Sequence, residues 1–111
     1  MNTRTAARNI NVSFSNSLYT SGKIANKDRL CDALILRKPI RNHYLITLGK
    51  ENELFRVYSL TELLQPFYDD ESFNVVGIAK GYFNTKKLLL KIIDDIYTDT
   101  GAFDVGHYFY P

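Results

Sequence analysis

Carboxylates are the first residues in this chain whose type and spacing could do chemistry. Six of them form two clusters: Asp69, Asp70 and Glu71, and Asp94, Asp95 and Asp99. Carboxylate oxygens suit Mg²⁺ or Ca²⁺, but adjacent side chains point in different directions and the alternating pattern of a calcium loop is missing. We therefore expect no metal here. The clusters are interpreted either as solvated surface or as an acidic surface that docks on an arginine-rich partner.

Nucleophilic and zinc chemistry find little support in the sequence. Two histidines and one cysteine are too few for a structural zinc site. Cys31 precedes an apolar run, which favours a buried hydrophobic side chain over a reactive thiolate. His107 with Asp104 could form an oriented base, but no nucleophile elbow or phosphate-binding loop accompanies the pair.

A near-match to a metal-dependent nuclease site is also incomplete. Asp69 or Asp70 precedes an apolar segment that ends in Lys80, but Ile78 stands where the second acid is needed. Without that carboxylate two metal ions cannot be held. We expect a protein that is not an enzyme and needs no cofactor, and a metal-dependent hydrolase is the third alternative.

Basic residues give a second candidate surface. Arg37 and Lys38 precede residues 39–42, which are interpreted as the loop of a β-hairpin, and Arg41 lies within that loop. Basic side chains near aromatic rings can hold phosphates and stack bases, although the isoelectric point of about 8.7 is below the value of about 9 typical of such domains. Two interpretations stay open: a nucleic-acid-binding hairpin, or a charged turn that keeps a sheet edge soluble.

The C-terminal aromatic residues are a third candidate. Tyr108, Phe109 and Tyr110 could anchor in a pocket of a partner protein, as aromatic side chains do at interface hot spots. The alternative is that this tail folds back over the core of its own chain.

Length and composition limit the possible classes of protein. The chain has 111 residues, 45% of them hydrophobic, which predicts one domain over 10–111 after a flexible N-terminal arm, 1–9. One cysteine fits a reducing compartment, and no apolar run approaches the roughly 20 residues of a membrane span. We expect a cytoplasmic protein without membrane contact, and the oligomeric state is left open. Residues 1–55 carry a charge of +5 and residues 56–111 carry −3, which is either ordinary surface or a bipolar one that orients a partner.

Hydrophobic periodicity predicts the elements that must position these residues. Alternation from Ile10 to Leu18 predicts a strand with one buried face. Further strands are predicted at Leu30–Lys38, His43–Leu48, Leu54–Tyr58 and Phe73–Ala79.

Two helices are expected from capping residues and spacing. Ser59 to Glu62 fits a capping box, and Pro66 keeps that helix short. Asn84 or Thr85 is expected to cap a long helix with an apolar stripe, which Gly101 ends. The fold class is α+β: a mostly antiparallel sheet of four to five strands, with the long C-terminal helix on one face and a short helix between strands.

The segment VVGIAKGYFNTKKLLLKIIDDIYTDTG, followed by FDVGHYF, resembles the C-terminal half of small uncharacterised proteins from phages and mobile elements of Gram-positive bacteria. The resemblance covers residues 73–109, and some of those proteins inhibit the type II CRISPR nuclease of the host. It implies a non-enzymatic, anti-CRISPR-type inhibitor in the host cytosol, with the effector nuclease as protein partner. In that reading the two acidic clusters compete for cationic side chains that hold DNA. A variant uses the basic hairpin to contact guide RNA or DNA. The alternative function is a small nucleic-acid-binding accessory protein.

Overall fold

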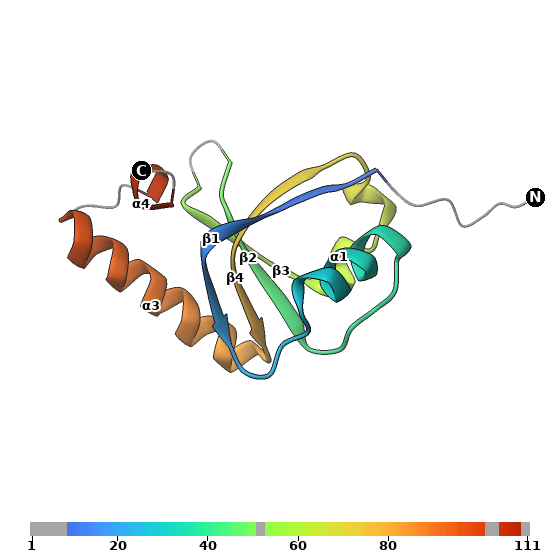
Figure 1. Cartoon of the computed structure of the whole chain (residues 1–111), viewed down its shortest axis with the longest axis horizontal. Helices are drawn as coiled ribbons and strands as arrows, with labels where there is room; N and C mark the ends of the chain where they lie inside the picture. The colour runs from blue at the N-terminus through green and yellow to red at the C-terminus, as the bar shows by residue number, and fades with distance from the viewer. Residues whose placement is uncertain (1–8, 51–52, 102–104, 110–111) are drawn as a thin grey trace, which may run out of the picture.

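A computed structural model describes residues 9–50, 53–101 and 105–109 of the chain, so the predicted arm lies outside it except for Asn9. The elements follow in the order β1 (Asn11–Ser21), α1 (Lys27–Leu36), β2 (His43–Leu48), β3 (Phe55–Ser59), α2 (Leu60–Leu63), the 3₁₀ turn η1 (Pro66–Tyr68), β4 (Ser72–Lys80), α3 (Tyr82–Thr100) and α4 (Val105–Phe109) (Figure 1). None of the helices in these ranges is long and apolar enough to cross a membrane.

The four strands form one mixed sheet in the order β1-β4-β2-β3. β2 pairs antiparallel with both of its neighbours, whereas β1 and β4 run parallel. The predicted α+β class is confirmed, but the sheet is not antiparallel throughout. A parallel pair needs a long connection between its strands, and here that connection contains α1, β2, β3 and α2.

The prediction of a strand at Leu30–Lys38 is wrong, because residues Lys27–Leu36 form helix α1. The Asn26 side chain caps this helix by accepting a hydrogen bond from the Arg29 N–H. Leu30, Ala33 and Leu34 are its buried residues, and their spacing places them on one helical face. The predicted β-hairpin is therefore absent, and residues 39–42 connect α1 to β2.

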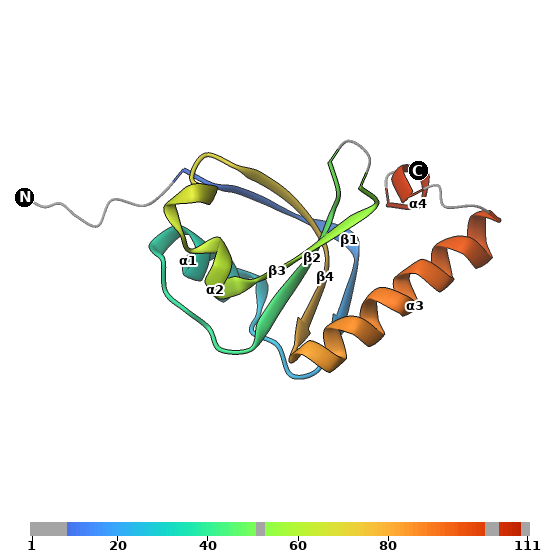
Figure 2. The same ribbon diagram turned by 180° about the vertical axis from the view of Figure 1, so that it is seen from behind.

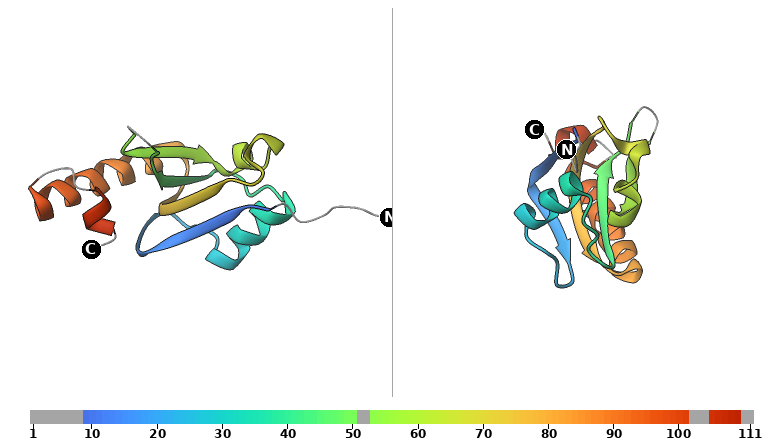
Figure 3. Two further views of the ribbon diagram at one scale, coloured as in Figure 1. Left: turned by 90° about the horizontal axis from the view of Figure 1, so that it is seen from above. Right: turned by 90° about the vertical axis from the view of Figure 1, so that its right-hand side faces the viewer.

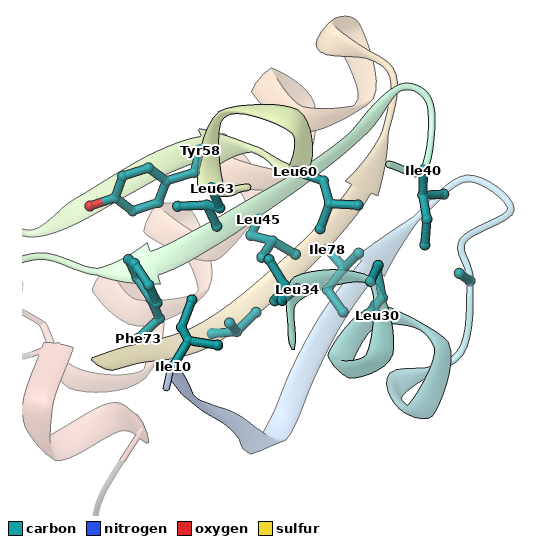
Figure 4. Packing of buried hydrophobic residues seen from close by; sticks show 13 residues of the cluster. Ile10, Leu30, Leu34, Ile40, Leu45, Tyr58, Leu60, Leu63, Phe73 and Ile78 are labelled. Atoms are coloured by element: carbon teal, nitrogen blue, oxygen red, sulfur yellow. The ribbon is translucent and has the colours of Figure 1, made fainter. Parts of the chain in front are cut away.

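The sheet lies between two helical layers (Figures 2 and 3). On one face, α1 and α2 cover the larger core cluster, which includes Leu30, Leu34, Leu45, Leu60 and Ile78 (Figure 4). On the other face, α3 and α4 cover a second cluster that consists of Ile46, Val76, Ala79, Leu88, Ile92, Ile96, Val105 and Phe109. The long helix on one face and the short helix between strands are as expected.

Helix α3 starts earlier than its predicted cap. Gly81 is the N-cap residue and Tyr82 is the first helical residue. The Thr85 hydroxyl donates to the Gly81 carbonyl, and the Asn84 amide donates to the Lys80 carbonyl. Both side chains therefore bond backward to carbonyl groups instead of capping an N–H, because they lie inside the first turn.

The rest of α3 follows its sequence pattern. Leu88, Ile92 and Ile96 are buried against the sheet, as the apolar stripe predicts. Gly101 ends the helix with φ of 72°, and its N–H donates to the Tyr97 carbonyl. A side chain at this position would be strained, so the predicted glycine cap is confirmed.

Candidate nucleic-acid interface

The site lies where the parallel strands β1 and β4 end at the same edge of the sheet. The chain leaving β1 leads to α1 on one face, and the chain leaving β4 leads directly to α3 on the other. Both connections lie at the lower edge of Figures 1 and 2. In open α/β sheets, ligands bind at such a switch point, because the diverging connections leave a crevice there.

A groove of about 550 Å³ opens at this edge. We call it the basic groove, and its lining residues are Lys23, Ile24, Ala25, Arg29, Pro39, Ile40, Arg41, His43 and Lys80. The four cationic side chains come from the loop after β1, from α1, from the loop before β2 and from the end of β4. All four residues are exposed. Within residues 9–50, 53–101 and 105–109, no ion pair joins any of them to a carboxylate.

The His43 ring fixes two of the segments that line the groove. The Ala25 N–H donates to His43 Nε2 at 3.0 Å, and His43 Nδ1 donates to the Arg41 carbonyl at 2.8 Å. Because Nε2 accepts in this arrangement, the ring proton is on Nδ1. His43 is only 5% exposed, so it holds the groove walls together and is not available to stack on a base.

Backbone contacts fix the third segment of the groove. His43 pairs with Lys80 at the end of the β2–β4 ladder, and the Gly81 N–H donates to the Asn42 carbonyl at 2.7 Å. Gly22 has φ of +85°, and a Cβ there would lie 3.2 Å from the Lys80 Cβ. Glycine therefore allows the loop after β1 to approach the end of β4 closely.

Of the three basic residues predicted as a binding surface, only Arg41 lines the groove. Lys38 lines a neighbouring depression of about 330 Å³, together with Arg29. Arg37 ends α1 and is tied to the acidic loop, residues 69–71: its guanidinium donates to both Asp69 carboxylate oxygens, at 2.7 and 2.6 Å, and to the Leu64 carbonyl. Arg37 therefore already has a partner within the fold, and its use in binding another molecule stays a prediction.

The acidic loop, predicted as partner-binding, is also engaged internally. Besides the Arg37–Asp69 pair, the Lys50 ammonium contacts the Glu71 carboxylate at 2.9 Å. The Asn9 amide donates to the Asp70 carboxylate at 3.1 Å. These carboxylates would have to leave their partners before they could bind an arginine on another protein.

The acids of α3 lie elsewhere on the molecule, at the far side of the sheet from the acidic loop (Figure 1). Asp95 accepts hydrogen bonds from the Tyr19 hydroxyl at 2.8 Å and from Lys91 at 3.3 Å. The bond from Tyr19 is the main reason that the pKa of Asp95 is lowered, and Lys91 adds to it. Asp94 and Asp99 are exposed. The two acidic clusters therefore do not form one surface.

Phe109 packs in the core of its own chain, so it would have to leave the core before it could anchor in a partner. This ring is 7% exposed and meets the Tyr19 ring edge-to-face at 6.4 Å. The Tyr108 hydroxyl lies 2.6 Å from the Tyr19 hydroxyl. Burial first, then these bonds, raise the pKa of Tyr19 well above its ordinary value. Tyr110 and the Asp104 of the possible base lie outside the described residues.

The described residues do not support the nuclease, metal or thiol chemistry considered from the sequence. In the nuclease near-match, Asp69 and Asp70 precede the nine-residue strand β4 and Lys80 ends it, so the acids and the lysine are separated by a strand about 26 Å long. No group of three metal-ligating side chains occurs in the described ranges. Burial, with Asp28 and Asp32 adding, raises the pKa of the Cys31 thiol and disfavours the thiolate.

The chain was compared with family models, curated proteins and solved structures. None gives a match. What the basic groove can do is therefore judged from its own geometry and charge: four exposed cationic side chains that line one groove can hold phosphate groups.

Sequence reasoning missed that Lys23, Arg29 and Lys80 belong to one surface. The local signal was present at Lys80, because a charged residue that directly follows a buried strand is at the edge of a sheet. The meeting of that edge with the loop after β1 depends on the parallel pairing of β1 with β4, which the sequence pattern did not reveal.

Proposed function

We propose that this protein is a non-enzymatic nucleic-acid-binding protein and that the basic groove holds the phosphate backbone of its ligand. One observation carries the proposal. The cationic side chains of Lys23, Arg29, Arg41 and Lys80 converge from separate segments, and no described carboxylate pairs with them. Like charges that share a groove repel one another, and phosphate groups relieve that repulsion.

The paired cations of the chain support this reading by contrast. Arg37, Lys50, Arg56 and Lys91 each contact a carboxylate within the fold. Lys27, Lys38, Lys86 and Lys87 also have no carboxylate partner among the described residues, so what distinguishes the groove cations is that four of them line one groove. The groove also lies at the carboxyl ends of the parallel pair β1 and β4, which is the position where open α/β sheets bind ligands, although this sheet is mixed.

The inhibitor hypothesis stays a prediction, and the groove favours one version of it. Because Asp69 and Asp95 have partners within the fold, the acidic clusters offer less charge to imitate DNA. An anti-CRISPR-type inhibitor would instead use the basic groove to contact guide RNA or DNA beside the nuclease. Both hypotheses therefore require the same first property, direct binding of nucleic acid.

The experiment measures fluorescence anisotropy of a labelled oligonucleotide between about 50 and 200 mM salt. Four phosphate contacts predict a slope of log K against log salt of about −3, which weakens binding about 60-fold over this range. The double variant Arg41→Gln/Lys80→Gln should lower the affinity about tenfold and flatten the slope by about 1.5.

The control is Lys50→Gln/Lys91→Gln, which removes the same charge from exposed ion pairs outside the groove. It should change the affinity less than threefold, because long-range effects of two distant charges are screened. Equal losses in both double variants, or binding that does not depend on salt, would refute the groove as the binding surface.

A further inference from the structure

Two exposed aromatic residues follow the groove directly in the chain. Tyr82 and Phe83 are the first residues of α3, and Lys80 of the groove precedes them. Their side chains are 63% and 79% exposed. Three Cα–Cα steps separate Phe83 from Lys80, so the two Cα atoms are at most about 11 Å apart. Tyr82 packs against Tyr44 on the α3 face of the sheet, whereas the groove lies on the α1 face. A ligand held in the groove would therefore reach this aromatic surface by passing around the end of the sheet.

The structure holds this aromatic surface in place. The Tyr82 ring meets the Tyr44 ring edge-to-face at 6.2 Å, and the Lys86 ammonium lies 5.6 Å from the Tyr82 centroid. The hydrogen bond from the Gly81 N–H to the Asn42 carbonyl ties the start of α3 to the groove wall. The exposed rings are therefore presented by an ordered turn.

The size of the groove limits what can enter it. A volume of about 550 Å³ is that of a site for a small molecule. The bases of a duplex are paired and stacked on one another, so they are not available to an aromatic side chain beside the groove. Bases become available for stacking on protein rings where the nucleic acid is single-stranded.

We propose that the ligand is single-stranded nucleic acid, with phosphates held by Arg41 and Lys80 and an unpaired base stacked on Tyr82 or Phe83. This inference rests on the proposed function of the groove and adds the class of ligand. Stacking tolerates every base, because each has a π face, so the geometry predicts little sequence preference.

The test compares three labelled ligands of equal length in anisotropy titrations: a single strand, the matching duplex and an abasic single strand. The wild-type protein should bind the single strand at least tenfold more tightly than the duplex. Tyr82→Ser/Phe83→Ser should weaken binding of the single strand about fivefold or more and leave binding of the abasic strand unchanged.

The matched control is Phe67→Ser/Tyr97→Ser, which also removes one Phe and one Tyr with exposed side chains (82% and 54%) that do not line the groove. It should leave all three affinities unchanged. Equal, salt-dependent binding of single strand and duplex would overturn this inference and leave the proposed function standing. Failure of all three ligands to bind would overturn both. Circular dichroism of each variant confirms that it folds.

Discussion

The charged residues at the two ends of strand β4 differ in whether they have partners within the fold. Before the strand, the acidic loop has its carboxylates matched to Arg37, Lys50 and Asn9. At the other end, the last residue of the strand, Lys80, lines the basic groove, whose cations have no carboxylate partner among the described residues. Of these two ends, only the acidic loop was predicted from the sequence to be a binding surface.

The difference teaches that the number of charges in a segment says less about function than their partners do. Exposed ion pairs contribute only about 0–1 kcal/mol each, so the paired end supports the fold modestly and offers little to a ligand. At the other end, the groove cations have no carboxylate partner among the described residues, and an anionic ligand would reduce the repulsion between them. Three expected outcomes would break or sharpen this contrast.

The largest effect is expected from His43→Leu. The substitution leaves the Ala25 N–H and the Arg41 carbonyl without their partner; the first contact is buried and the second is partly buried. Each unpaired group costs about 1–3 kcal/mol, so unfolding in urea should show a loss of about 2–4 kcal/mol. Oligonucleotide binding should also weaken, because two walls of the groove lose their connection. An unchanged urea midpoint would mean that this ring does not hold the groove end together.

A smaller and more selective effect should separate Arg37→Ala from Arg41→Ala, which remove the same charge. Arg37→Ala breaks a partly exposed ion pair and should lower the free energy of unfolding by about 1 kcal/mol or less, with little change in binding. Arg41→Ala should weaken binding severalfold and leave stability unchanged. Urea unfolding and anisotropy, measured on both variants, give this comparison. If both variants lost binding to the same extent, or both lost stability to the same extent, the two ends of β4 would not differ in this way.

The smallest effect concerns the third charged region, where Asp95 meets Tyr19. The lowered pKa of Asp95 means that its bonds stabilise the fold above the ordinary carboxyl value of 3.8, and that this contribution is lost as the pH falls through the lower, folded value. Tyr19→Phe removes the main cause, so the pKa of Asp95 should rise toward 3.8. An NMR titration of the Asp95 carboxyl carbon measures it. A pKa unaltered by the substitution would show that Tyr19 does not engage the Asp95 carboxylate.

Much of the fold could be predicted from the sequence, and the errors have a clear physical origin. Alternation at 10–18 and the stripe of α3 are local patterns, and they identified β1 and α3. Residues 30–38 were misassigned because a short apolar run suits a strand as well as a buried helix. The spacing of Leu30, Ala33 and Leu34 after the cap at Asn26 is the signal that decides between them.

The candidate site was harder to predict than the fold. Arg41 was identified from its basic neighbours, but the groove depends on the parallel pairing of β1 with β4, a contact between distant segments. Local patterns do not specify such pairing. For the same reason, the sequence could not show that Arg37 and the acidic loop neutralise each other across the end of α1.

The most direct measurement is an NMR titration of ¹⁵N-labelled protein with a short single-stranded oligonucleotide. The largest amide shifts are predicted at residues 22–29, 39–43 and 80–83, with none in the acidic loop. Shifts concentrated at residues 69–71 or 94–99, or no shifts at all, would contradict a binding surface at the unpaired end of β4.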